Sequence, residues 1–300
     1  MDVSVIIVNY NTIELTRNCL ISVFEQTKDI DFEVIVSDNG STDGSIEMIK
    51  NEFPNVVLIE NKANLGFGAA NNRGLKIAKG KYIFYLNSDT VLLNNAVKMF
   101  FDYWENAENK ELIGALGAWL LKDNQVIHSF GDFPTCRNIF GTFFRAIRSS
   151  LFGNLKKYRK TVKKNNNPDD FKTKEIYGYI TGADLFVRND PSAIFDERYF
   201  MYFEESDLQF NNFFRKGLKR IILTEPKIVH FEGGSDKKTY KYDFKKMSAI
   251  FYWRSCLLYF RKNFPKEKLF LYTLKFLVRL IYLFPQNISN SKKMKDFCEV

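Results

Sequence analysis

The sequence has little of the residues that define several protein classes. Its 300 residues include only 4 cysteines, 7 prolines and 16 glycines, which excludes a disulfide framework, a collagen-like chain and a low-complexity chain. The cysteines are scattered without a Cys-x-x-Cys pair, so we expect reduced thiols in a cytosolic compartment and no structural zinc site. No signal-peptide pattern precedes the first apolar run. The composition, 45% hydrophobic and 26% charged, is that of a globular protein with a sizeable core.

Charge is distributed unevenly along the chain. Residues 1–136 carry 11 basic and 18 acidic residues, whereas residues 137–164 carry nine basic residues and no acidic one. Residues 237–300 carry 15 basic and 4 acidic residues. This pattern indicates a catalytic body docked on an anionic surface, for which nucleic acid and an anionic membrane leaflet are both candidates.

The first 90 residues alternate short apolar runs with amphipathic stretches. The runs at 3–10, 32–38, 55–60 and 81–89 are typical of buried parallel strands, and the stretches between them predict helices. Strands alternating with helices imply an α/β fold with a mostly parallel central sheet, whose ligands bind at the carboxyl ends of the strands. Further strands are expected at 112–121, 177–188 and on both sides of Pro226, and a helix is expected at 204–217.

Polar side chains stand where these strands end. Asn87 and Asp89 are two positions apart in an extended segment, so they point the same way and could offer oxygens to one Mg²⁺ or Mn²⁺ ion. Asp38 could accept the N3–H of a uracil or thymine, and His230 closes a later strand. The alternative for each is structural, because Asn and Asp also cap helices and shape turns.

Two further segments have candidate chemistry. Glu204, Glu205 and Asp207 cluster at a predicted helix start, where they could cap the helix or supply a general base. The glycine-rich segment 64–74 lacks the third glycine of a dinucleotide fingerprint and the Gly-Lys-Ser/Thr of a P-loop. It could still place a helix N-terminus beside a nucleotide.

The C-terminal part of the chain differs in character. Residues 269–284 are apolar and aromatic but too short and too charged for a confident transmembrane helix. Lys268, Lys275 and Arg279 fall on one helical face, which favours an amphipathic helix lying in a bilayer interface. The alternative is a helix packed on the catalytic body or on a partner subunit. Residues 137–174 predict a basic surface loop with a helix in its first half.

Seven motifs occur in order: VSVIIVNYNT, EVIVSDNGSTDGS, LIENKANLGFGAANNRGL, YIFYLNSDT, ITGADLFVR, FDERYFMYFEESDL and VHFEGGS. Over residues 2–236 the chain resembles family 2 glycosyltransferases, in particular the rhamnosyltransferase-like branch that builds bacterial surface polysaccharides. The resemblance implies a GT-A catalytic domain at 1–236, and the charge and amphipathic pattern described above predicts a helical, membrane-associated extension at 237–300. The resemblance also implies an inverting, metal-dependent sugar transfer from a nucleoside diphosphate donor.

The same resemblance assigns roles to individual residues. The metal, Mn²⁺ or Mg²⁺, would be held by Asp89 and His230, with Asn87 as a weaker ligand. Glu205 would be the general base, one methylene longer than the family's usual Asp, with Glu204 or Asp207 as substitutes. The nucleotide sugar would be bound by these residues: Val8, Tyr10, Asn11, Asp38, Asn64, Gly66, Phe67, Asn71, Asn72, Asn87 and Ser88.

The sequence thus predicts a glycosyltransferase at the inner face of the cell membrane. The expected donor is dTDP-rhamnose, with UDP-sugars next, and the expected acceptor is a glycan on a polyprenyl diphosphate. The alternative is a non-catalytic relative, suggested by Asn87 and Glu205 at positions where the family has Asp. Nucleic-acid binding is not expected, because a pI of about 9.1 is its only support and no recognition motif is present.

Overall fold

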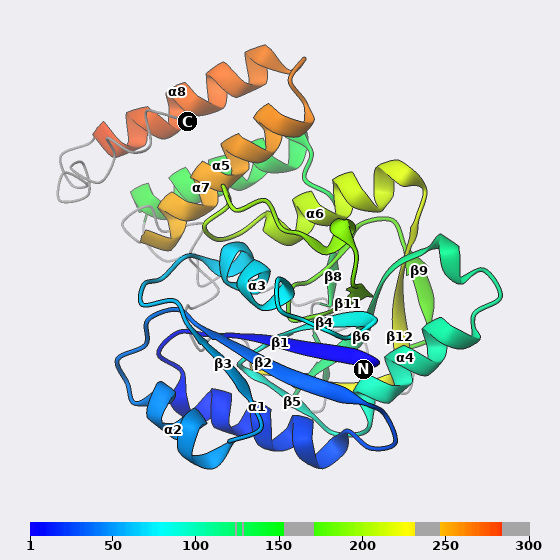
Figure 1. Cartoon of the computed structure of the whole chain (residues 1–300). Coiled ribbons are helices and arrows are strands. Elements are labelled where there is room, and N and C mark those ends of the chain that lie inside the picture. Colours follow the sequence, from blue (N-terminus) through cyan, green and yellow to red (C-terminus); the bar gives the residue numbers. More distant parts are fainter. Residues whose placement is uncertain (124, 128, 153–170, 232–246, 284–300) are drawn as a thin grey trace. The chain divides into compact units, whose positions relative to one another are not determined.

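The computed structural model describes residues 1–123, 125–127, 129–152, 171–231 and 247–283 (Figure 1). Within this part the chain separates into two compact units. The first contains 1–133, 171–198 and 205–231, and the second contains 134–152, 199–204 and 247–283.

A large mixed sheet organises the first unit. Its strands lie in the order β3-β2-β1-β4-β11-β6-β12-β5, with β7 paired to β6 and β9 paired to β12. Strands β3, β2, β1 and β4 are parallel, as are β6 and β12, whereas β11 and β5 run antiparallel to their neighbours. Strands β8 and β10 form a separate small sheet. The strands are β1 Val3–Asn9, β2 Phe32–Asp38, β3 Val57–Glu60, β4 Tyr82–Asn87, β5 Thr90–Leu92, β6 Ile113–Lys122, β7 Gln125–Val126, β8 Phe130–Gly131, β9 Lys174–Ile176, β10 Tyr179–Ile180, β11 Asp184–Arg188 and β12 Lys219–His230.

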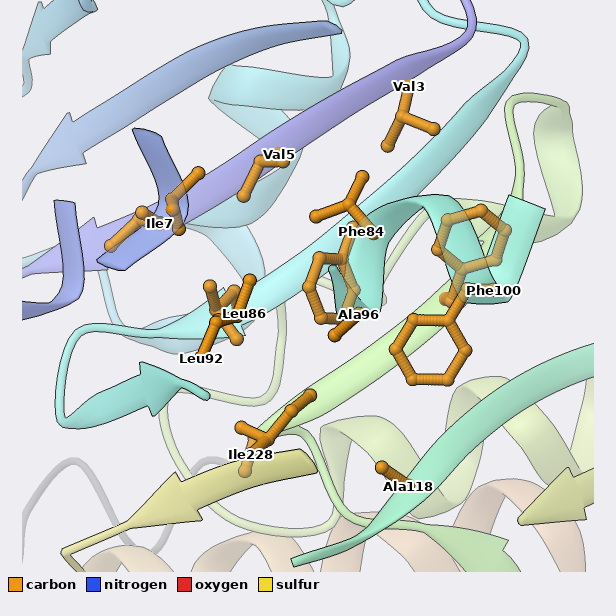
Figure 2. Close-up of a cluster of buried hydrophobic side chains, with 14 of the residues drawn as sticks. Val3, Val5, Ile7, Phe84, Leu86, Leu92, Ala96, Phe100, Ala118 and Ile228 are labelled. Atoms are coloured by element: carbon orange, nitrogen blue, oxygen red, sulfur yellow. The ribbon is translucent and has the colours of Figure 1, made fainter. Parts of the chain in front are cut away.

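Helices cover both faces of this sheet, as the strand–helix alternation predicted. In Figure 1, α1 and α2 lie on one side of the sheet and α3 lies on the other. Successive side chains of a strand point to opposite faces, so Val3, Val5 and Ile7 pack on the α1 side while Ile6 belongs to the α3 side. Figure 2 shows the first of these clusters. The helices of this unit are α1 Ile13–Gln26, α2 Ser45–Glu52, α3 Phe67–Leu75, α4 Ala96–Asn106 and α6 Glu204–Asn212, the last beginning at the boundary between the units.

Two strand predictions are corrected by the structure. The segment 177–188 is not one strand but β10 and β11, because Thr181, Gly182 and Ala183 leave the extended ladder between them. The segment around Pro226 is not two strands but the single strand β12, whose pairing with β6 shifts register between Leu223 and Ile228. Proline has no N–H for the ladder, and the shift accommodates it within one strand.

The second unit is built from α5 Cys136–Phe152, α7 Met247–Asn263 and α8 Lys268–Leu283. Aromatic contacts join the three helices, with ring centroids 5.3 Å apart for Phe143 and Trp253 and 4.9 Å apart for Phe140 and Phe270. Helix α5 corresponds to the helix expected in the first half of 137–174, and residues 153–170 of that segment lie outside the described part. None of the described helices is long and apolar enough to cross a membrane.

Candidate active site

The loops after β1 and β2 are joined through one buried amide. Asn9 is fully buried, and its Nδ2 donates to Asp38 Oδ2 at 2.6 Å and to Ser41 Oγ at 3.0 Å. Its Oδ1 accepts from the hydroxyls of Thr12 and Thr16 at 2.8 and 2.7 Å. The parallel pairing of β1 with β2 brings Asn9 opposite Asp38, which fixes this arrangement.

Asp38 shapes the turn that follows β2. Its Oδ1 accepts the backbone N–H groups of Gly40 and Ser41 at 2.9 and 2.8 Å, and the residue is fully buried. The structural alternative for Asp38 is therefore realised, and its predicted contact with a nucleobase stays a prediction.

The residues after Asn9 also connect the loops that follow β1 and β2, and the ring of Tyr10 stays accessible. Asn11, with φ of 53°, donates its N–H to Ser41 Oγ at 2.9 Å and accepts from the N–H of Thr42 at 2.8 Å. Tyr10 is 43% exposed beside this pair of loops, while Val8 is partly buried. A flat accessible ring on a rigid loop can stack on a nucleobase.

The glycine-rich segment is tied to the β2 loop by Asn39. Its Nδ2 donates to Gly66 O at 3.1 Å and to Asn64 Oδ1 at 3.3 Å, and Asn64 Oδ1 also accepts from the N–H of Gly66 at 3.0 Å. Gly66 has φ of 87°, a conformation that favours glycine, and α3 begins at Phe67 directly afterwards. Asn64 and Gly66 thus lie next to the β2 loop with Phe67 directly after them, and their predicted contact with the nucleotide stays a prediction.

Asn71 and Asn72 are used internally in the structure. Asn71 is 1% exposed and donates to Phe67 O within its own helix. Both ends of the Asn72 amide bond the backbone of Phe195, and Nδ2 also donates to Glu197. These contacts give both residues a structural role, and their predicted contact with the nucleotide stays a prediction.

The turn after β4 brings together the predicted metal ligands. Asp89 Oδ1 and His230 Nε2 are 3.2 Å apart, and both side chains are 15% exposed. Antiparallel pairing of Thr90 with His230 and a bond from the N–H of Phe231 to Asp89 O hold them in register. Asn87 and Ser88 are partly buried beside them, and Ser88 Oγ lies 3.2 Å from Thr12 Oγ1, which connects this turn to α1.

Asp89 and His230 fit a divalent ion as a pair but do not complete its coordination. Two ligands at about 2.1 Å from an octahedral ion stand roughly 3.0 Å apart, close to the observed separation. The buried Nδ1 of His230 has no hydrogen-bond partner among the described residues. The described residues contain no cluster of three or more His, Cys, Asp or Glu side chains suited to a metal. Such an ion would take its remaining ligands from water and substrate phosphates, as Mg²⁺ usually does.

Glu205 is linked to the turn after β4 by Gly182 and Ala183, which precede β11. The N–H of Asn87 donates to Ala183 O at 3.0 Å. A Cβ on the preceding Gly182 would lie 3.2 Å from Phe67 Cε1 and 3.9 Å from Glu205 Cβ. Burial raises the pKa of the Glu205 carboxyl, against opposing backbone hydrogen bonds. A carboxyl group with a raised pKa beside the turn that holds the predicted metal ligands suits general base chemistry.

The other two acidic residues of the cluster are placed differently. Asp207 is 2% exposed, and its Oδ1 accepts from Asn211 at 3.1 Å. Glu204 is buried and belongs to the second unit. Neither is part of the contacts around Gly182, so Glu205 is the carboxylate that these contacts favour.

Gly182 and Asn9 were not predicted as site residues. Asn9 ends β1 and Gly182 lies in the turn between β10 and β11, both inside motifs already noted, and Gly182 stands two positions before Asp184, the buried carboxylate that begins β11. A pocket of about 590 Å³ between α4 and β12 shares no residue with the predicted site. The pocket is not part of the proposed sugar-transfer site. Its lining includes Met99, Tyr103 and Ile221 but none of the residues predicted to bind the metal or the nucleotide.

A mixed, mostly parallel sheet with an Asp–His pair and a buried carboxylate near its carboxyl edge is typical of nucleotide-sugar transferases. The family model "Glycosyl transferase family 2" matches residues 4–170, and the chain belongs to that family.

Relatives and solved structures agree with this assignment. The chain is 35% identical over 121 residues to the poly(ribitol-phosphate) beta-glucosyltransferase of Bacillus spizizenii, covering 39% of this chain and 19% of that protein. The first curated relatives are matched over less than half of their length, 46% at most. The mannosyltransferase PcManGT of Pyrobaculum calidifontis, solved with GDP-Man and Mn²⁺, has a TM-score of 0.55 at 16% identity over 93% of this chain and 72% of its own. S. aureus TarS 1–349 with UDP-GlcNAc has a TM-score of 0.50 at 16% identity over 98% of this chain and 76% of its own. These likenesses establish the GT-A type of fold.

Proposed function

We propose that this protein is an inverting, metal-dependent glycosyltransferase that moves a sugar from a nucleoside diphosphate donor to a surface-polymer acceptor. The observation that supports the proposal most directly is the Asp89–His230 pair at 3.2 Å at the carboxyl edge of the sheet. This edge is where ligands of open α/β sheets bind.

The donor nucleotide would lie over the loops joined by Asn9 and Asp38. Tyr10 would stack on the base, and the segment from Asn64 to Phe67 would line the ribose side. The motif resemblance favours dTDP-rhamnose. The UDP-GlcNAc complex of TarS and the glucosyltransferase name of the Bacillus relative favour a UDP-sugar. We infer a uracil or thymine base, because dTDP and UDP carry one or the other. Asp38, at the end of β2, is the residue predicted to accept the N3–H of either base.

In the proposed reaction each of this chain's groups has a defined task. Asp89 and His230 would hold the divalent ion, and a bound ion would stabilise the charge that grows on the departing diphosphate. Glu205, whose carboxyl pKa is raised by burial, would in its deprotonated form accept the proton of the acceptor hydroxyl as that oxygen attacks the anomeric carbon. A single carboxylate positioned as base, with no second one as nucleophile, favours inversion over retention.

The acceptor is proposed by its chemistry. The Bacillus relative's name specifies a poly(ribitol phosphate), which is a phosphate-rich polyol chain. A protein with a formal net charge of +9 would attract such a chain. A glycan on a polyprenyl diphosphate offers the same phosphate chemistry and remains the other proposed acceptor.

The test is donor turnover with the full chain. The protein with Mn²⁺ would be incubated with UDP-glucose, UDP-GlcNAc or dTDP-rhamnose, with and without poly(ribitol phosphate), and released nucleoside diphosphate would be measured. Asp89→Ala and Glu205→Gln should lower turnover by about 10²–10⁴-fold. Glu111→Gln, an exposed acidic site elsewhere in the first unit, is the matched control and should retain activity.

A binding measurement distinguishes the proposed enzyme from the alternative, a non-catalytic relative. A thermal shift with UDP or dTDP that needs Mn²⁺, together with no release of nucleoside diphosphate from any donor, would favour that alternative. Near-normal turnover of Asp89→Ala would contradict the metal assignment.

A further inference from the structure

Helix α8 presents an apolar row on its accessible face. Leu269, Tyr272 and Phe276 are 82%, 71% and 61% exposed, and they recur at spacings of three and four residues, so they share one side of the helix. The opposite side, with Phe270, Leu274 and Val278, is buried in the second unit. Three large apolar side chains exposed in a row exceed the single scattered exposures that are ordinary on protein surfaces.

A pocket between α7 and α8 adjoins this row. Its volume is about 390 Å³, and it shares Tyr272 with the row. Three cations, Arg261, Lys268 and Lys275, line it without any acidic residue. Arg261 and Lys268 are exposed and form no ion pair within the described residues.

The pocket also has an apolar lining. Its remaining residues are Leu257, Pro265 and Leu271. The described segment 247–283 holds seven basic residues and one acidic residue, so the charge around the pocket is positive in balance. A pocket that combines cations with apolar walls, next to an exposed apolar row, matches a molecule with a phosphate head and a hydrocarbon tail.

We propose that the α7–α8 pocket and the adjoining row of α8 form a docking site for an anionic phospholipid bilayer. Lipid phosphates would lie among Arg261, Lys268 and Lys275, while Leu269, Tyr272 and Phe276 would enter the boundary between headgroups and acyl chains. This is the geometry of an amphipathic helix lying in the interface plane. The docking site is separate from the sugar-transfer chemistry, so its test does not depend on the proposed function.

The test is co-sedimentation of the full chain with vesicles. We expect the protein to pellet with phosphatidylcholine vesicles that contain phosphatidylglycerol, and to remain mostly in solution with phosphatidylcholine alone. Each basic residue near an anionic leaflet strengthens binding by about fivefold. The triple variant R261Q/K268Q/K275Q should therefore partition about 100-fold more weakly.

Matched variants control for net charge and for surface hydrophobicity. K28Q/K76Q/K79Q removes the same charge from exposed positions of the first unit and should bind as the wild type does. L269S/Y272S/F276S should also release the protein, whereas I21S/I77S/L112S, which removes exposed apolar residues of the first unit, should not. Circular dichroism would verify that every variant is folded.

Three results would overturn the proposal. The first is equal pelleting with neutral and anionic vesicles, and the second is unchanged partitioning of R261Q/K268Q/K275Q. The third is saturable binding of inorganic phosphate that needs these three cations while vesicles are not bound, which would make the pocket a site for a soluble phosphate.

Discussion

Replacing Asn9 by alanine should destabilise the first unit and loosen the proposed nucleotide loops together. The Asn9 amide donates to the buried Asp38 carboxylate at 2.6 Å, and a hydrogen bond to a charged group contributes about 1.5–3 kcal/mol. Its Oδ1 also accepts from Thr16, a fully buried hydroxyl that costs about 1–3 kcal/mol when left without a partner. Thr16 can turn to Thr12 Oγ1 at 3.2 Å, so the lower ends of both ranges apply. We expect a loss of about 2.5 kcal/mol in the free energy of unfolding.

The assay is urea unfolding at neutral pH, followed by circular dichroism and tryptophan fluorescence. Thr16→Val alone should cost about 1 kcal/mol, because Asn9 Oδ1 still accepts from Thr12. In the Asn9→Ala background the same Thr16→Val change should cost less, since their shared bond is already gone. A loss below about 1 kcal/mol for Asn9→Ala, with an unchanged slope of free energy against urea, would refute the reasoning.

The remaining predictions concern proton binding and close packing around the site. Burial raises the pKa of Glu205 above its ordinary 4.5, so kcat/KM should rise with pH through a midpoint above 4.5, and Glu205→Gln should remove this limb from the pH profile. A limb centred at or below pH 4.5 would contradict the assignment. Burial also raises the pKa of Asp184 well above 3.8. The folded state therefore holds a proton that the unfolded state has released, and the unfolding free energy should fall as pH rises above 3.8 until it passes the folded pKa. Asp184→Asn should flatten this dependence in urea unfolding across pH, and an equally steep profile would disprove it. Gly182→Val should lower kcat about tenfold, because its Cβ would stand 3.2 Å from Phe67 Cε1 and 3.9 Å from Glu205 Cβ, so the larger side chain would displace one or both. Steady-state kinetics with unchanged circular dichroism would check it, and wild-type kcat would count against the role given to Gly182.

The local parts of the fold could be predicted from the sequence because their signals are local. The apolar runs that became β1, β2 and β4 and the helices between them follow from hydrophobic periodicity. The position of β11, antiparallel between β4 and β6, could not be predicted, because periodicity does not report which strands become neighbours.

The same distinction applies to the site. Asp89 and His230 were predicted from strand ends and motif order, and the structure places them within 3.2 Å. The bonds of Asn72 to the backbone of Phe195 could not be predicted, because Phe195 lies 123 positions away along the chain. The sequence pattern around an amide side chain in a glycine-rich segment is the same whether that amide contacts a ligand or a distant backbone carbonyl.

The pairing of β5 with β12 has a consequence for biosynthesis. Asp89 follows an early strand, whereas His230 ends the last strand of its unit, so their meeting depends on a contact of large sequence separation. Such contacts form late, since the intervening loop must first be closed. During synthesis from the N-terminus, the strands up to β4 can pair on the ribosome while the Asp–His corner is still missing. The nascent chain should thus form its Asp89–His230 pair only after His230 has left the exit tunnel.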